Sequence, residues 1–163
     1  MINLLELKHS VIRQLSEHWK QVDFDGLSKD KKRFVTYKFK IEKTKLSNLL
    51  GHVIHRPLNY FKSKDNGKEI LGIGSHITYT KKYDYNKLLG LIESDSDLTF
   101  LGAQRFNSNS KRDEAWAGFD ECHFTLPKII FETTNEATVL KVVFNKKSIS
   151  TEDKRSNALF ELE

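Results

Sequence analysis

The sequence predicts an α+β fold in which a largely antiparallel sheet has helices packed on one face. Apolar residues recur at helical spacing near the N-terminus, and apolar and polar residues then alternate strictly in residues 35–42. Further along, two pairs of strand-like segments are joined by short turns. Strands joined in this way are antiparallel, and helices placed between them cover a sheet face. The 163 residues are predicted to form a single domain over residues 1–163.

The composition of the chain argues against several functional classes of protein. With 38% hydrophobic and 30% charged residues, the chain has a typical globular composition. Its apolar runs are shorter than the roughly 20 residues of a membrane span, so no membrane partner is expected. One cysteine, Cys122, excludes an intrachain disulfide, and the N-terminus lacks a secretory pattern, which predicts a cytoplasmic location. The net charge of +5 is dispersed, which favours solvated lysines over a nucleic-acid footprint.

The first two predicted elements are a helix over residues 4–20 and a strand over residues 35–42. Helical spacing gathers four apolar residues on one side of the helix as predicted core: Leu5, Ile12, Leu15 and Trp19. A polar connection, residues 23–33, follows. The strand presents four apolar residues to one sheet face and its lysines to water, the apolar set being Val35, Tyr37, Phe39 and Ile41.

The middle of the chain predicts a short helix, a hairpin and a second helix. Thr44 can cap a short helix that Gly51 ends. Residues 58–62 and 69–80 read as strands around an Asn66-Gly67 turn, because this dipeptide tolerates positive φ. Asp84 can then cap a helix whose apolar residues are Leu88, Leu89, Leu91 and Ile92.

The remaining residues predict three strands and a final helix. Residues 98–106 are mostly apolar, as in a strand covered on both faces, and a polar loop follows at 107–114. Residues 122–133 and 137–145 form a second predicted hairpin. The capping-box pattern Ser150-Thr-Glu-Asp153 then starts a helix from Thr151.

Two possible catalytic motifs do not meet their structural requirements. Gly72-Ile-Gly74 begins like a dinucleotide-binding loop, but it lies within a predicted strand and Ile77 replaces the third glycine. Close backbone packing or a bulge explains these glycines better. Cys122 and His123 are neighbours in a predicted strand, so their side chains point to opposite faces and cannot act as nucleophile and base.

Two possible metal sites are equally weak. His52 and His55 follow Gly51 and precede Pro57, which disfavours the helix that would bring them together. Glu93, Asp95 and Asp97 lack the glycine and final glutamate of a calcium loop, so a solvated turn is predicted. The residues alone therefore indicate no catalytic, cofactor-binding or metal-ligating residue.

The order of features from about Thr44 to Asn145 nevertheless resembles that of a known family. Residues 58–61 form an aromatic strand, followed by the turn at 65–67 and by Ile70-Leu-Gly-Ile-Gly74. The later segments that match are Leu98-Thr-Phe-Leu-Gly-Ala-Gln-Arg-Phe106, Trp116 with Phe119, Phe124-Thr-Leu-Pro127 and Ala137-Thr-Val-Leu-Lys-Val-Val-Phe144.

In combination these segments resemble the N-terminal part of isochorismate synthase, of the menaquinone type. This enzyme belongs to the chorismate-utilising family, with salicylate, anthranilate and aminodeoxychorismate synthases. The resemblance implies the N-terminal portion of the family fold, with residues 151–163 as a junction helix. The family's chemistry lies in its C-terminal half, where a lysine is the general base, a glutamate the general acid, and further glutamates hold Mg²⁺.

Those C-terminal motifs are absent here, and Lys141-Val-Val143 aligns with a strand of the N-terminal part. The resemblance therefore implies a scaffold that is inactive alone, with the catalytic half as its partner and with Mg²⁺ required only by the full-length enzyme. A stand-alone interaction protein derived from the family is a further possibility. The alternative class is a small basic module that binds nucleic acid or another anionic ligand, with four aromatic residues available for stacking: Tyr37, Phe39, Tyr60 and Phe61.

Overall fold

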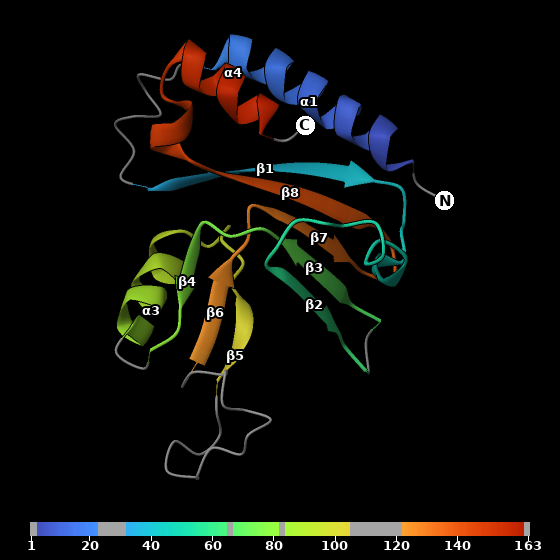
Figure 1. Ribbon diagram of the computed structural model, residues 1–163, viewed down its shortest axis with the longest axis vertical. Coiled ribbons are helices and arrows are strands. Elements are labelled where there is room, and N and C mark those ends of the chain that lie inside the picture. Colours follow the sequence, from blue (N-terminus) through green and yellow to red (C-terminus); the bar gives the residue numbers. More distant parts are fainter. Residues whose placement is uncertain (1–2, 23–31, 65–66, 82–83, 105–121, 162–163) are drawn as a thin grey trace.

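The fold is α+β, as predicted, and contains two antiparallel sheets (Figure 1). The computed structural model describes residues 3–22, 32–64, 67–81, 84–104 and 122–161. Its helices are α1 (Leu4–Gln21), α3 (Tyr85–Ser94) and α4 (Glu152–Phe160), with the short 3-10 helices η1 (Leu46–Asn48) and η4 (Lys146–Ile149). Its strands are β1 (Phe34–Ile41), β2 (Leu58–Lys62), β3 (Glu69–Ile73), β4 (Ile77–Tyr79), β5 (Leu101–Gln104), β6 (Cys122–Leu126), β7 (Ile129–Thr133) and β8 (Thr138–Asn145).

The larger sheet has five strands in the order β1-β8-β7-β3-β2, and the smaller has the order β4-β6-β5. Every pairing is antiparallel. The predicted hairpins β2–β3 and β7–β8 both form, with Gly67 at φ +61° in the first turn. The edge strand β1 pairs with β8 over the full length of both strands, from Phe34 opposite Asn145 to Ile41 opposite Thr138.

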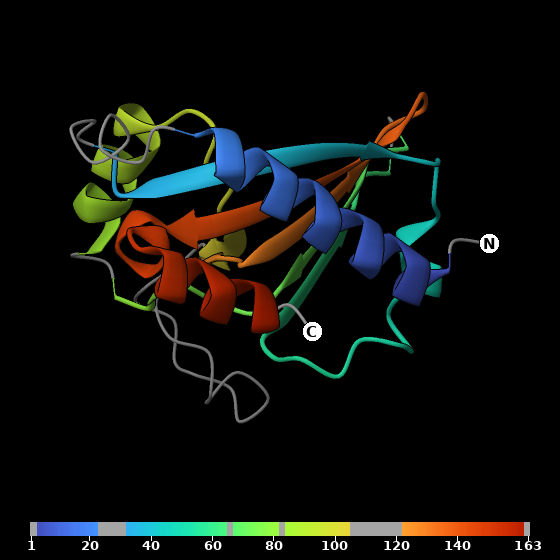
Figure 2. The ribbon, with the colours of Figure 1, turned by 90° about the horizontal axis from the view of Figure 1, so that it is seen from above.

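One face of the five-stranded sheet, the helix face, is covered by α1 and α4 (Figures 1 and 2). Its largest side chain from α1 is Trp19, whose ring meets the rings of Phe144 and Tyr37 edge-on at 5.2 and 6.1 Å between centroids. The buried residues of this core are Val11, Leu15, Trp19, Leu46, Leu49, Leu71, Ile73, Phe131, Leu140, Val142, Phe144, Ile149 and Ala158. Leu15 and Trp19 were predicted here. Leu5 was wrongly predicted, because α1 is rotated so that Val11 is buried and Leu5 is exposed.

The opposite face of the same sheet, the second face, is covered by the three-stranded sheet, with α3 beside it (Figure 1). The apolar contacts between the sheets are made by Phe34, Ile70, Leu98, Leu101, Leu126, Ile130 and Val143. Gly72 lies where the two sheets are in close contact, since a Cβ there would be 2.6 Å from both Leu101 Cδ1 and Pro127 Cγ. This confirms the prediction of close backbone packing at Gly72. Helices therefore cover the helix face, while a second sheet covers the other.

Two predicted strands are each divided between the two sheets. The chain leaves β3 at Gly74, which has φ +68°, and enters β4 after His76. It returns from β6 to β7 through Pro127 and Lys128. These two crossing segments lie side by side and are joined by hydrogen bonds from Lys128 N to Ile73 O, 3.1 Å, and from His76 N to Leu126 O, 2.9 Å. The predictions of continuous strands over 69–80 and 122–133 were wrong, since apolar periodicity continues through a change of sheet.

Other predicted boundaries also shift. β5 covers only Leu101–Gln104, and of these Leu101 alone is buried, so the prediction of a strand covered on both faces was wrong. Residues 105–121, which include the predicted polar loop, Trp116 and Phe119, lie outside the described residues. No helix in the described ranges has the length and apolar character needed to cross a membrane.

Only part of the helix capping that the sequence predicts is found in the structure. Thr151 caps α4 by accepting a hydrogen bond from Lys154 N, 3.4 Å, one residue later than a Ser150 box would require. Thr44 donates to Glu42 O instead of capping, and the segment after it is a single 3-10 turn. The start of that turn is held by Glu69, whose Oε2 accepts from Leu46 N at 2.8 Å. Asp84 precedes α3 as predicted, but makes no side-chain capping hydrogen bond.

Candidate functional site

The cysteine and histidines examined in the sequence do not converge on one another. Cys122 is buried in β6 with its Sγ 3.9 Å from Tyr79 O, whereas His123 Nε2 lies 3.4 Å from Thr125 Oγ1. These different partners place the Cys122 and His123 side chains on opposite faces of the strand. His52 and His55 line two different cavities, so they do not share a site.

The acidic residues after α3 are engaged by lysines from distant parts of the chain. Asp95 is only 5% exposed, and its Oδ1 lies 3.0 Å from Lys32 Nζ and accepts from Asp97 N at 3.2 Å. Asp97 pairs with Lys38, and this hydrogen bond outweighs partial burial to lower the pKa of Asp97. The prediction of a solvated turn was therefore wrong for Asp95. The lysines lie some sixty positions earlier in the chain, so the local sequence gives no sign of them.

A second ion pair lies nearby on the second face. Lys141 Nζ is 2.9 Å from Glu132 Oε1 and donates to Thr99 Oγ1 at 3.2 Å. The two charged side chains are 13% and 20% exposed. Lys38 lies directly opposite Lys141 across β1 and β8, a like-charge arrangement that Asp97 and Glu132 offset. We call these residues (Lys38, Asp97, Thr99, Glu132 and Lys141) the charged network; Lys141 serves there as a structural ion-pair partner.

Within the described residues no group of three or more His, Cys, Asp or Glu side chains is placed to hold a metal ion. The best-buried carboxylates are already committed, since Glu69 pairs with Lys62 and Asp95 with Lys32. Burial favours the protonated form of Glu69, but hydrogen bonds from Lys62 and from the amides of Leu46 and Ser47 outweigh it and lower its pKa. The described residues therefore do not fit a Mg²⁺ site. That the whole chain contributes no ligand stays a prediction.

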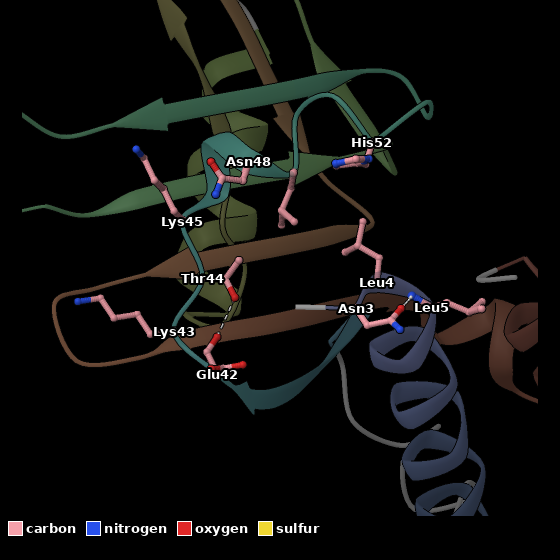
Figure 3. A pocket seen from close by; sticks show the side chains of 10 residues that line it. Asn3, Leu4, Leu5, Glu42, Lys43, Thr44, Lys45, Asn48 and His52 are labelled. Carbon is pink, nitrogen blue, oxygen red and sulfur yellow. Dashed lines mark hydrogen bonds between the residues drawn. The ribbon is translucent and has the colours of Figure 1, made fainter. Parts of the chain in front are cut away.

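One cavity, of about 620 Å³, lies between the start of α1 and the connection from β1 to η1. Figure 3 shows Leu4 and His52 facing each other, while Lys43 and Lys45 extend away from α1. Two of its polar groups have structural partners, since Asn3 Oδ1 accepts from Leu5 N at 3.1 Å and Lys43 Nζ donates to Asn135 O at 2.8 Å. The lining residues are Asn3, Leu4, Leu5, Glu42, Lys43, Thr44, Lys45, Asn48, Leu49 and His52. No nucleophile adjoins a base among them.

A second cavity, of about 590 Å³, opens where the two crossing segments meet α4. We call it the basic cavity. It is lined by apolar residues of β3, β7, β8 and α4, by four Lys or Arg side chains and two histidines, and by one carboxylate, that of Glu161. The polar and charged lining side chains are His55, Arg56, Ser75, His76, Lys128, Lys147, Ser148, Lys154, Asn157 and Glu161.

His76 is a partly buried polar group of the basic cavity. Its Nε2 lies 2.7 Å from Val143 O, so Nε2 carries a proton and donates it to this carbonyl. Burial lowers the pKa of His76, an effect that the hydrogen bond to Val143 opposes and the charge of Lys128 reinforces. His76 is therefore a neutral donor that fixes the crossing segment to β8.

Exposed apolar side chains gather on α3. Tyr85, Leu89 and Ile92 are all exposed and spaced four and three residues apart, which places them along one side of the helix. Phe61 is exposed on β2, an edge strand of the five-stranded sheet. The other large exposed apolar residues among those described lie singly on separate segments: Leu5, Ile54 and Phe160.

The basic cavity was not predicted, because its residues come from five segments spread over a hundred positions. Only the cluster Lys146-Lys147 and the position of Arg56 before Pro57 stand out locally, and neither indicates a shared cavity.

Comparison with known proteins shows likeness in fold alone. No family model matches the sequence, and no curated protein matches it either. Among solved structures, the fold is similar to that of MenF, the menaquinone-specific isochorismate synthase from Escherichia coli, with a TM-score of 0.58 and 12% identity. The match covers 80% of this chain but 29% of that one, so the chain spans less than a third of the length of this structural neighbour.

Proposed function

We propose that this chain is the N-terminal scaffold of an isochorismate synthase of the chorismate-utilising family. In this role it does not react with substrate. It forms a layered body against which a separate catalytic half, its partner, packs. The fold likeness to MenF over 80% of this chain and 29% of that one is the observation that carries the proposal.

The sequence resemblance supports the proposal independently of the fold comparison. The segments that resemble the family occupy β2, β3, β5, β6 and β8 of the described fold. Lys141, which imitates the family's lysine motif, lies in β8 and is paired with Glu132. Its ammonium group is thus engaged within this chain, since it also donates to Thr99 Oγ1 at 3.2 Å.

The apolar side of α3 is the best surface for contact with a catalytic half. Tyr85, Leu89 and Ile92 present adjacent apolar side chains, and contiguous exposed apolar surface is typical of interaction sites. The unpaired edge of β2, with Phe61 exposed beside it, offers a second contact.

Since the described residues do not fit Mg²⁺, we assign its binding and all proton transfer to the catalytic half. Within this chain the proposed contribution is positional: the two sheets and α3 hold a surface in place. We further place the protein in the cytoplasm, on the basis of its single cysteine.

The alternative, a module that stacks nucleic-acid bases, is less favoured by the geometry. Tyr37, Phe39 and Tyr60 pack against the core of the helix face, which leaves Phe61 as the one exposed ring of the four. Stacking platforms need several accessible rings along a basic groove.

The test is to assay the purified 163-residue chain with chorismate and Mg²⁺, alone and mixed with the polypeptide encoded downstream of Glu163. We expect no turnover by the chain alone and isochorismate formation by the mixture. Turnover by the chain alone, or a downstream sequence without the lysine and glutamate motifs, would refute the proposal.

A variant pair then tests the role of α3. Leu89→Lys should weaken reconstitution, because it places a charge within the apolar side of the helix. Ile54→Lys is the matched control, since Ile54 is 84% exposed and lies away from that side. Equal reconstitution by both variants would show that α3 is not the contact surface.

A further inference from the structure

The basic cavity concentrates positive charge in one place. Arg56, Lys128, Lys147 and Lys154 line it together with one carboxylate, Glu161. Among the described residues only Lys128 of these four forms an ion pair, with 3.6 Å between its Nζ and Glu161 Oε2. Positively charged side chains gathered at a concave surface raise the local concentration of anions.

The floor of the cavity is apolar and well packed. Ile73, Val142 and Phe144 are buried in the sheet beneath it, and Ala158 is buried on α4. The volume of about 590 Å³ is in the range of small-molecule sites, which combine apolar walls with a few polar groups. A ligand that fits both features has an apolar body and an anionic group.

The frame of the cavity is fixed by backbone hydrogen bonds. Gly74 N donates to Pro57 O at 2.9 Å, Lys128 N to Ile73 O at 3.1 Å, and Val143 N to Lys128 O at 2.8 Å. These three amides are therefore already used, and the lysine and arginine side chains are the charged donors that line the cavity. On the remaining wall, three α4 residues line the cavity, Lys154, Asn157 and Ala158, and Glu161 lines it directly after the helix.

We propose that the basic cavity binds a small organic anion, a carboxylate or phosphate monoester with an apolar body. The body rests on Ile73, Val142 and Phe144, and the anionic group is held by the Lys147 and Lys154 ammonium groups with Arg56 nearby. Charge-assisted hydrogen bonds from these side chains provide most of the selectivity. Because the cations meet at one cavity and do not form a stripe, a small anion fits better than a nucleic-acid strand. This inference does not rest on the proposed function.

The experiment is a titration of the isotope-labelled 163-residue chain, followed by amide chemical shifts in low-salt buffer. The probes are phenyl phosphate, benzoate, inorganic phosphate and neutral benzamide. We expect phenyl phosphate and benzoate to shift the amides of residues 74–76, 128, 147–148 and 154–158. Inorganic phosphate should bind more weakly, because it lacks the apolar body, and benzamide should leave these amides unchanged.

Variants identify the charged side chains that determine the affinity for the anion. Lys147→Gln/Lys154→Gln should weaken phenyl phosphate binding about tenfold, equivalent to about 1.4 kcal/mol. Lys40→Gln/Lys45→Gln removes the same charge from exposed positions outside the cavity and should leave the affinity nearly unchanged. Glu161→Gln removes the one carboxylate and should strengthen binding. Unchanged amide spectra away from the cavity would show that each variant is folded.

Three outcomes would overturn the proposal. Equal shifts with benzamide and benzoate would show that charge is not recognised. Equal weakening by the two double variants would show that net charge alone matters. A single-stranded oligonucleotide that bound more tightly than phenyl phosphate, and lost this binding in Lys147→Gln/Lys154→Gln, would assign the cavity to nucleic acid instead.

Discussion

The two faces of the five-stranded sheet are built in different ways. The helix face has an apolar core of thirteen buried residues, which come from α1, η1 and the adjoining Leu49, η4, α4 and the three strands β3, β7 and β8. The second face has seven buried apolar residues, and beside them lie the charged network, two chain crossings and a glycine contact. The helix face is therefore expected to supply most of the stability, because burial of apolar area is the main favourable term in folding. On the second face, the positions of the packed segments depend on specific polar and steric contacts.

The largest expected effect is on the helix face. Leu15 and Leu126 are both fully buried, Leu15 on the side of α1 that faces the sheet and Leu126 between the two sheets. Leu15→Ala should lower the free energy of unfolding by about 2–5 kcal/mol, measured by urea denaturation. Leu126→Ala should cost less, because the small sheet can shift to close part of the cavity that is left. A larger loss for Leu126→Ala would reverse the ranking of the two faces.

The next effect concerns the charged network of the second face. Glu132→Gln leaves Lys141 mostly buried without its counter-charge, and should cost about 1.5–3 kcal/mol in the free energy of unfolding. Asp84→Asn is the control, since it breaks the Lys87–Asp84 pair, whose lysine side chain is 66% exposed, and should cost at most about 1 kcal/mol.

A double variant distinguishes the cost of an unpaired buried charge from the contribution of side-chain packing. Replacing Glu132 by Leu and Lys141 by Met together should recover most of the loss, because no charge is then left unpaired. If Glu132→Gln costs no more than Asp84→Asn, the network contributes little and the second face is held by its apolar residues alone.

The contrast between the faces also explains what could be predicted from the sequence. The helix face was largely predictable, because α1 and β1 show their own periods and Leu15, Trp19, Tyr37 and Phe39 follow them. The second face depends on residues distant in sequence. Nothing in residues 93–97 shows that Asp95 will be buried against Lys32, and nothing in residues 69–80 shows that the strand will change sheets at Gly74.

The basic cavity could not be predicted for the same reason. Arg56, Lys128, Lys147 and Lys154 are ordinary surface residues in the sequence, and they come together only because both crossing segments pass α4. Sequence reasoning did succeed at Gly72, where a glycine inside a strand indicated close backbone approach.

A smaller effect tests how closely strands pack on the side of the second face. A Cβ at Gly102 would lie 1.9 Å from the backbone oxygen of His123, so Gly102→Ala should cost about 1–3 kcal/mol in unfolding free energy. Gly90→Ala is the matched control in α3, where a Cβ meets nothing within 4 Å. It should stabilise the protein by about 0.5–1 kcal/mol, because alanine favours a helix interior over glycine. Equal thermal midpoints for the two variants would show that β5 can move away from β6.

The smallest expected effect is a pH dependence at His76, which ties the crossing segment to β8. Because burial lowers the pKa of His76, the unfolded chain binds a proton more readily than the folded protein does. The stability that His76 contributes is therefore fully present above its pKa in the unfolded chain, about 6.5. It is lost as the pH falls through the lower pKa of His76 in the folded protein. The urea midpoint of the wild type should therefore be lower at about pH 5.5 than at about pH 7.5. The decrease should be smaller in His76→Gln, whose amide can still donate to Val143 O. Asp97 and Glu69 do not interfere, since their lowered pKa values confine their losses to more acidic solution. A midpoint that is unchanged in the wild type, or that falls equally in both proteins, would show that His76 accepts a proton without releasing the crossing segment.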